Sequence, residues 1–362
     1  MQKFIILTLF LSVVILTMGA GCSISLKSAD TSATDGGFWV SLDKGVSWRQ
    51  VNAVPTIKGA PDSLASFDDY SLALDPGDTN ALYFGSVANG LYYTYNISGG
   101  WTAAASLKEV KINAIAVSPD DKCLIYAAAG NKAYRSSDCN RTWQQIYFDN
   151  ELAAKISSVA IDYYDAKRIY LGNSRGEILR STDRGDHWAT VLRSGSSINQ
   201  IVISPQDSRI ILVTTAGEGL YRSTDRGDNW APLKSKMTEF KNSFNIVTLV
   251  ASPVQEGLLF AATAYGLLSS ADNGDSWIRI QLITPEKEVS INSLAVNPKD
   301  PKEIYYVTNT TFYSSSDGGA SWRTRKLPTT RAGWRLLIKP DEVNVIFMGV
   351  KKYQANNSAF GG

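Results

Sequence analysis

The stretch Ser223-Thr224-Asp225-Arg226-Gly227-Asp228-Asn229-Trp230 contains the pattern that decides the fold, Ser-x-Asp-x-Gly-x-x-Trp. A weaker copy at 95–101 keeps a Gly and the Trp but lacks the Asp. In each clear copy we expect a tight turn, because the carboxylate can accept backbone N–H groups and the Gly can adopt a positive φ. The pattern occurs six times, once with Asn140 in place of the Gly, and its aspartates are Asp43, Asp138, Asp183, Asp225, Asp272 and Asp317.

The spacing of the copies indicates a repeat architecture. Their tryptophans recur at intervals of 42 to 53 residues, and a period near 45 residues is typical of repeat proteins. Each repeat also has an apolar run before a Pro, as in Ile201-Val-Ile203-Ser-Pro205, although Tyr163 takes the Pro place once. Each repeat therefore holds four short strands, A to D, with strand A before the Pro and the Asp turn between strands C and D. Such units repeated radially form a β-propeller.

The two ends of the chain complement each other. Residues 37–53 supply strands C and D alone, and residues 333–350 supply strands A and B alone. We expect these halves to join into one blade, whereas a linear solenoid would need a cap at each end. The sequence therefore predicts an all-β fold, a seven-bladed β-propeller of four-stranded antiparallel blades closed by its termini.

The repeated turn resembles the Asp box, or bacterial neuraminidase repeat, over essentially the whole chain after the N-terminal segment. Propellers of this type include sialidases, certain endoglucanases, sortilin and the photosystem II stability/assembly factors. The chain lacks the Arg-Ile-Pro segment of sialidases, the second propeller of the endoglucanases and the Cys-rich tail of sortilin. It looks most like the assembly factors, which are single lipid-anchored propellers that bind a membrane-protein client, although their Arg-rich patch has no residue-by-residue counterpart.

The N-terminal segment predicts export. Lys3 precedes an apolar run at 4–18, and small residues at 19–21 precede Cys22. A short apolar run behind a positive residue is typical of a secretory signal, and the small residues before Cys22 resemble a bacterial lipobox. We expect a signal peptide at 1–21, a lipid on Cys22, a flexible tether at 22–35 and one propeller domain at 36–362, outside the cytoplasm on a bacterial membrane. The alternatives are an ordinary cleaved signal or an uncleaved anchor.

Several kinds of site have no support in the sequence. The net charge is +2 and no Lys/Arg cluster dominates a stretch, so nucleic-acid binding is not expected. The Asp-box carboxylates are isolated in separate blades, which makes poor cation sites, so we expect them to be structural and predict no metal or cofactor. His187, the only His, lies inside an Asp box and supports no catalytic triad.

Function is expected on the face opposite the Asp boxes, where the D–A and B–C loops emerge. Counting back from each Pro places one residue per blade at the mouth of the central channel. The predicted ligand-face residues are Tyr70, Lys111, Asn113, Asn199, Asn292, Arg331, Trp334 and Arg335. The alternative is that the Asn residues cap strand ends and the mouth holds only water.

Two cysteines predict a disulfide. Cys123 begins strand B and Cys139 follows strand C of the same blade, so the hairpin register places them opposite each other. A disulfide is permitted outside the cytoplasm. The alternative is two reduced thiols.

Two functions remain open. The first is a non-catalytic scaffold that binds a protein client. The second is a glycan-binding or glycoside-hydrolase propeller, which as a hydrolase would need two carboxylates about 5–9.5 Å apart. The candidate carboxylates on the predicted ligand face are Asp68, Asp69, Asp149, Glu151, Glu218, Glu239 and Glu288.

Overall fold

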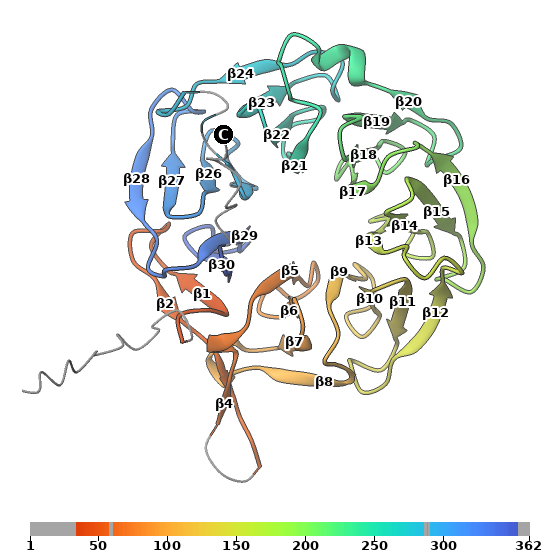
Figure 1. Ribbon diagram of the computed structural model, residues 1–362, viewed down its shortest axis with the longest axis vertical. Coiled ribbons are helices and arrows are strands. Elements are labelled where there is room, and N and C mark those ends of the chain that lie inside the picture. The colour runs from red at the N-terminus through yellow and green to blue at the C-terminus, as the bar shows by residue number, and fades with distance from the viewer. Residues whose placement is uncertain (1–33, 58–60, 286–287, 289, 354–362) are drawn as a thin grey trace, which may run out of the picture. The chain divides into compact units, whose positions relative to one another are not determined.

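Seven four-stranded antiparallel sheets stand around a central channel (Figure 1). The computed structural model describes residues 34–57, 61–285, 288 and 290–353. The predicted signal peptide and Cys22 lie outside the described residues, as does most of the predicted tether. No helix in the described part of the chain combines the length and the apolar character that crossing a bilayer requires.

Each blade contributes one strand to each of four concentric positions. The innermost strands are β5 (Asp69–Leu74), β9 (Ile112–Val117), β13 (Ile156–Ile161), β17 (Ile198–Ile203), β21 (Ile246–Ala251), β25 (Ser293–Val296) and β29 (Ala332–Ile338). The second strands are β6 (Leu82–Ser86), β10 (Ile125–Ala129), β14 (Ile169–Asn173), β18 (Ile211–Thr215), β22 (Leu259–Thr263), β26 (Ile304–Val307) and β30 (Ile346–Lys351).

The outer half of each blade contains the strands that flank the Asp box. The third strands are β7 (Gly90–Thr94), β11 (Lys132–Ser136), β15 (Glu177–Ser181), β19 (Leu220–Ser223), β23 (Leu267–Ser270), β27 (Thr311–Ser315) and β1 (Phe38–Ser41). The outermost are β8 (Thr102–Lys108), β12 (Gln144–Phe148), β16 (Ala189–Arg193), β20 (Ala231–Pro232), β24 (Ile278–Ile280), β28 (Arg323–Lys326) and β2 (Arg49–Gln50). Outside the blades lie β3 (Ala53–Val54), β4 (Asp62–Ser63) and the 3-10 turns η2 (Leu64–Ser66), η3 (Ile97–Gly99) and η4 (Lys234–Met237).

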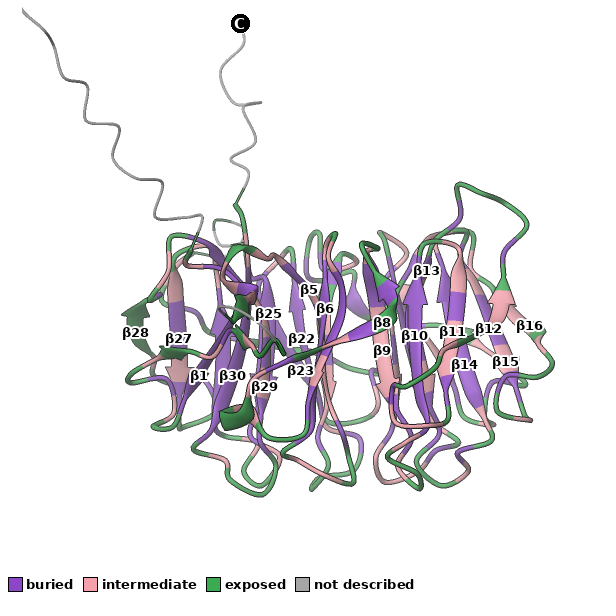
Figure 2. Cartoon of the chain, turned by 90° about the horizontal axis from the view of Figure 1, so that it is seen from below, coloured by how far each residue is buried: buried purple, intermediate pink, exposed green. Residues whose placement is uncertain are grey.

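The core lies between neighbouring blades. Second strands such as β10 and β18 are buried along their whole length, while the outermost β28 is exposed at every residue (Figure 2). Apolar clusters join successive sheets, and the Asp-box tryptophans extend them outward. Trp101, for example, packs edge to face on Phe38 of the neighbouring blade, with ring centroids 5.0 Å apart. Burial of large aromatic side chains between sheets is therefore what holds the ring together.

The predicted ring closure is confirmed. Strand β1 pairs antiparallel with β30, with Phe38 opposite Gly349 and Ser41 opposite Ile346, so the closing sheet has the order β2-β1-β30-β29. Segments more than three hundred residues apart in sequence thus share one blade, which closes the ring.

Candidate functional site

The Asp-box turns lie on one face, and hydrogen bonds within each turn satisfy their polar groups. In the copy at 223–230, the Ser223 hydroxyl donates to Asp225 at 2.8 Å and accepts the Gly227 N–H at 2.8 Å. Asp225 also accepts the backbone and side-chain N–H groups of Asn229, and these bonds lower the pKa of Asp225 to about 2. Equivalent bonds recur at Asp43, Asp138, Asp183, Asp272 and Asp317.

Side chains from one blade also bind the Asp-box turn of the next. Arg180 on β15 donates to the Arg226 carbonyl at 2.9 Å and to Asp228 at 2.6 Å. Arg135 and Arg222 make the same kind of link to the boxes that follow them. No group of three or more His, Cys, Asp or Glu side chains among the described residues is arranged to hold a metal ion. The polar groups of this face are therefore committed to structure.

In the structure, the eroded seventh copy of the Asp box aligns with the other copies differently from what the sequence pattern suggested. Aligned on Trp101, Thr94 takes the Ser place, Asn96 the Asp place and Ser98 the Gly place. Asn96 accepts the Ser98 N–H at 3.0 Å and the turn becomes the 3-10 element η3. The Gly that the sequence pattern suggested as preserved therefore does not occupy the Gly place of the box, because Thr94 and Asn96 replace the Ser and the Asp.

The central channel has a volume of about 670 Å³ and is lined by the inner strands. Its described lining consists of apolar, hydroxyl and amide side chains, with Arg335 as the only charged group. No Asp or Glu side chain is among the described residues that line it. The channel wall is thus neutral, and its charge is concentrated near one entrance.

A repeated β-bulge determines which side chains surround that entrance. In six of the seven inner strands the pairing register skips one residue, and each skipped residue is one that counting back from the Pro placed at the mouth. The skipped residues are Tyr70, Asn113, Ser157, Asn199, Val247 and Trp334. Because a bulge redirects a side chain out of the regular alternation, this device places a variable residue of each blade at the channel mouth.

The three Asn residues of the predicted site have different environments. Asn113 is buried and donates to the Ile156 carbonyl of the next blade at 2.9 Å. Asn292 is buried and donates to Asn309 at 2.9 Å. Asn199 is exposed in the channel lining. Two of them therefore join structural elements, as the alternative interpretation supposed, and only Asn199 is open to a ligand.

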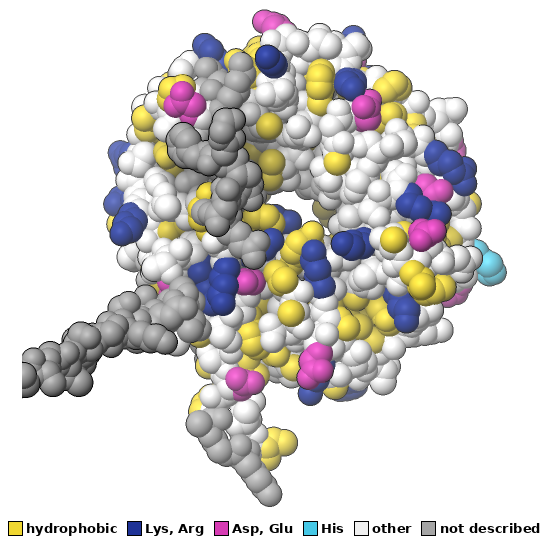
Figure 3. Space-filling view, viewed as in Figure 1, with side chains coloured by type: hydrophobic (Ala, Val, Ile, Leu, Met, Phe, Trp, Pro, Cys, Tyr) yellow, Lys and Arg dark blue, Asp and Glu magenta, His cyan; other side chains and the backbone are white. Residues whose placement is uncertain are grey.

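Two aromatic rings and three cations gather on one side of the mouth, and we call these five residues the mouth cluster: Tyr70, Lys111, Trp334, Arg335 and Lys351. Lys111 Nζ lies 3.4 Å from the centre of the Tyr70 ring, and Lys351 Nζ lies 4.1 Å from that of Trp334. Arg335 Cζ lies 5.4 Å from the Trp334 ring. Figure 3 shows Lys and Arg side chains gathered beside the channel opening. Lys351 was absent from the sequence prediction, which placed the last two strands within 333–350.

A buried carboxyl group lies beside the mouth cluster. Asp69 immediately precedes Tyr70, its side chain is 0% exposed, and neither carboxylate oxygen has a hydrogen-bond partner in the described structure. Gly349 leaves the space that the carboxyl group fills, because a Cβ at that position would overlap it. Burial raises the pKa of Asp69 to about 7, although the charges of Arg335 and Lys351 favour its ionised form.

Arg331 corrects the sequence prediction. Its side chain is only 1% exposed and donates to Asp68 at 2.6 Å and to the Phe67 carbonyl at 2.8 Å. Asp35 lies 3.6 Å from the Arg331 guanidinium and accepts the Thr330 N–H. Arg331 therefore ties the two ends of the chain together beneath the surface and is not a ligand-face residue.

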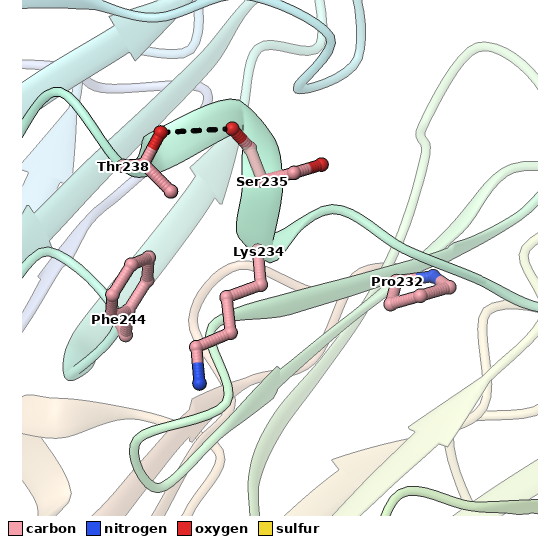
Figure 4. A pocket seen from close by; sticks show the side chains of 5 residues that line it. All are labelled: Pro232, Lys234, Ser235, Thr238 and Phe244. Carbon is pink, nitrogen blue, oxygen red and sulfur yellow. Dashed lines mark hydrogen bonds between the residues drawn. The ribbon is translucent and has the colours of Figure 1, made fainter.

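The candidate hydrolase carboxylates are mostly committed elsewhere. Asp68 binds Arg331, and Asp149 is buried with Arg175 at 3.1 Å. Glu218 pairs with Lys234 at 3.0 Å. The Glu218–Lys234 pair borders a shallow hollow of about 550 Å³ beside η4, lined by Pro232, Lys234, Ser235, Thr238 and Phe244 (Figure 4). The remaining candidates, Glu151, Glu239 and Glu288, are exposed.

Cys123 and Cys139 are joined in the structure as a disulfide. The bond links the loop before β10 to the Asp box after β11, where Cys139 adopts a φ of 57°. This box is the one that has Asn140 in place of Gly. The crosslink therefore lies on the scaffold face, away from the mouth cluster.

Comparisons with known proteins agree with this architecture. The Sortilin-Vps10 family model (sortilin, neurotensin receptor 3) matches residues 131–248, which are 118 of the 362 residues. No curated protein matches the chain in sequence.

Solved structures with a similar fold include GH74 enzymes and YCF48. The GH74 xyloglucanase from Xanthomonas campestris superposes with a TM-score of 0.65 and 20% identity, covering 84% of this chain and 52% of that enzyme. YCF48 bound to a D1 peptide superposes with a TM-score of 0.61 and 16% identity, covering 82% of this chain and 95% of YCF48. YCF48 from Cyanidioschyzon merolae gives a TM-score of 0.60 and 14% identity, covering 82% and 97%.

The chain thus spans about half the length of the GH74 enzymes and nearly the whole length of YCF48. At these identities the likeness concerns the fold. With its seven closed blades and its repeated turns, the chain is an Asp-box β-propeller whose fold is shared with the GH74 enzymes and with YCF48.

Proposed function

We propose that this propeller is a non-catalytic scaffold, anchored at the cell envelope through Cys22, that binds a protein client on the face opposite the Asp boxes. The observation that carries the proposal is the mouth cluster, in which partly exposed cations and aromatic rings meet at the entrance of a neutral channel. Aromatic and Arg side chains are the groups that most often anchor protein interfaces. The nearly full-length likeness to YCF48, a structure of which contains a bound peptide, supports the same role.

Glycoside hydrolysis is the second candidate, favoured by the raised pKa of Asp69 next to another carboxylate, Asp68. A general acid must reach the glycosidic oxygen, however, and Asp69 is completely buried. Asp68 is held by Arg331 and by the Lys352 N–H at 2.7 Å. The pair therefore lacks the open cleft between two carboxylates that hydrolysis requires, which favours the scaffold.

Site-specific photo-crosslinking in the native membrane tests the proposal. Leu152, in the loop before β13 on the proposed client face, is 81% exposed, and Leu42, in an Asp box on the other face, is 57% exposed. A photoreactive residue at position 152 should capture one protein reproducibly, while the same residue at position 42 should not. In the same cells, palmitate labelling should be lost in Cys22→Ser.

Two results would contradict the scaffold role. Capture from position 42 alone would place the client on the wrong face. Capture of no protein from either position, together with binding of the purified propeller to a glycan array, would favour the glycan hypothesis. Persistent palmitate labelling of Cys22→Ser would disprove the anchor.

A further inference from the structure

Building on the proposed scaffold role, we propose that the mouth cluster binds a carboxylate of an acidic peptide segment, and that Asp69 competes with this carboxylate for the same cations. The site is the group formed by Tyr70, Lys111, Trp334, Arg335 and Lys351, at the entrance of the channel.

The placement of the cations favours a compact anion over a sugar ring. A sugar stacks on an aromatic side chain only where the face of the ring is open. Here Lys111 lies over the Tyr70 ring at 3.4 Å, and Lys351 lies over the Trp334 ring at 4.1 Å. With those faces occupied, the groups that remain available are the ammonium and guanidinium donors, which bind carboxylates strongly. An acidic side chain in an extended segment fits a channel whose wall offers hydroxyl and amide groups.

The three cations of the mouth cluster form no direct ion pair. In the described part of the chain, Lys111, Arg335 and Lys351 form no ion pair with any carboxylate, whereas the neighbouring Arg331 is paired with Asp68. Burial lowers the pKa of Arg335 and of Lys351, so both are partly removed from water without a direct partner. Desolvated cations of this kind gain most from a ligand that supplies the missing negative charge.

Asp69 is the internal competitor. The charged groups that act on Asp69 are Arg335 on β29, Lys351 at the end of β30 and Asp68 in its own segment, and the only titratable side chain on the paired strand β6 is Tyr83. Of these, Arg335 and Lys351 stabilise its negative charge and Asp68 opposes it. Ionised Asp69 therefore neutralises the cations that the ligand needs, and protonated Asp69 leaves them available.

The competition makes the affinity for an acidic peptide change with pH in a defined direction. The pKa of Asp69 is about 7, so its carboxyl is mostly protonated at pH 6 and mostly ionised at pH 8. The side-chain carboxylates of a peptide stay ionised across this range. Affinity for an acidic peptide should therefore fall as pH rises from 6 to 8, and by linkage a bound carboxylate should raise the pKa of Asp69.

Peptide binding to the whole propeller tests the inference. The probes are a short Glu/Gly peptide and its Gln/Gly analogue, both acetylated and amidated, with binding followed by fluorescence anisotropy at low salt. The Glu peptide should bind more tightly than the Gln peptide, and Lys351→Met should weaken it on the order of tenfold. Lys111→Met is a second variant should Lys351→Met fold poorly. Lys326→Met, on the exposed strand β28, is the matched control and should change nothing.

Asp69→Asn tests the competition directly. It should strengthen Glu-peptide binding several-fold at pH 8, leave it unchanged at pH 6, and abolish the pH dependence between them. The hydrogen bond to Asp183 raises the pKa of His187, but this residue lies in an Asp box on the far face, so His187→Gln should keep the pH dependence.

The following results would overturn the inference. Equal affinity for the Glu and Gln peptides would show that no carboxylate is recognised. Equal loss in Lys326→Met and Lys351→Met would show only general charge attraction. Tighter binding of oligogalacturonate than of the Glu peptide, with the same loss in Lys351→Met, would assign the site to an acidic saccharide. If position 152 still captures a client that the Glu peptide cannot displace, the inference fails and the scaffold role stands.

Discussion

The two faces of the propeller use their charged groups in opposite ways. On the Asp-box face each carboxylate accepts backbone and side-chain bonds within its own turn, as Asp317 does from Ser321. On the other face Asp69 is buried without a hydrogen bond, and Lys111 and Lys351 lie over aromatic rings without counterions. The first arrangement is repeated blade by blade, while the second occurs once, around the junction of the first and last inner strands.

This difference indicates which positions of such a fold can change their side chains without loss of stability. An Asp-box turn contributes to stability locally, so the same solution serves six blades. The bulge in the inner strand fixes only the direction of a side chain, and its identity is free to vary from Tyr70 to Asn199 to Val247. A repeated backbone device thus supplies positions on one face at which binding groups can be assembled without altering the scaffold.

The largest change in stability is expected at the buried Arg331–Asp68 ion pair, which lies beneath the client face. Arg331→Met should lower the free energy of unfolding by about 3–5 kcal/mol, because it removes a buried cation from Asp68 and leaves that carboxylate poorly paired. Urea unfolding followed by tryptophan fluorescence measures the loss. Lys326→Met on β28 provides the exposed control and should change stability by less than about 0.5 kcal/mol. Similar stability of the two variants would mean that the closure does not depend on this ion pair.

Two glycines, one on each face, allow the stability of the two faces to be compared at single positions. Gly45, in an Asp box, has a φ of 84°, and a Cβ there would overlap the buried Phe312 ring. Gly195, in the loop between β16 and β17 on the other face, has a φ of 73° with nothing within 4 Å of a Cβ. Gly45→Ala should cost about 2–4 kcal/mol, since backbone strain and overpacking add, and Gly195→Ala about 1 kcal/mol from strain alone. Equal losses in urea unfolding would show that packing beneath the box contributes nothing.

The scaffold could be predicted from the sequence because its determinants are local. A Ser, an Asp and a Gly within five residues are sufficient to form the turn, as the bonds of Ser223, Asp225 and Gly227 show. The period of the tryptophans then gave the blades, and the complementary ends gave the closure that β1 and β30 confirm. Counting back from the Pro of each repeat also selected residues that the structure places at β-bulges, although the bulges themselves were not predicted.

The composition of the mouth was harder to predict because it depends on distant partners. Arg331 looked like a surface cation, and its burial depends on Asp68 and Asp35, both more than 260 residues away in sequence. Lys351 was missed because the last strand runs one residue beyond its apolar part, and that residue is Lys351. Asp69 looked exposed, because alternation along a strand does not show that the bulge at Tyr70 turns the residue before it into the junction with β30.

The last predicted change in stability distinguishes the two faces by its sign. In the folded protein the pKa of Asp317 is about 2, lowered chiefly by Ser321, so its contribution is complete above its unfolded pKa near 3.8 and is lost as pH falls. Asp69 is the opposite case: its folded pKa of about 7 exceeds the unfolded value, so its ionisation lowers stability as pH rises from about 4 to 7.

Asp69→Asn should therefore be more stable than the wild type at pH 8, by about 2 kcal/mol once the cost of an unpartnered amide is subtracted. The advantage should shrink as urea unfolding is repeated toward pH 5. Parallel pH profiles for the two proteins would mean that Asp69 is not protonated in the fold, and the carboxyl group could not then regulate the mouth cluster as proposed.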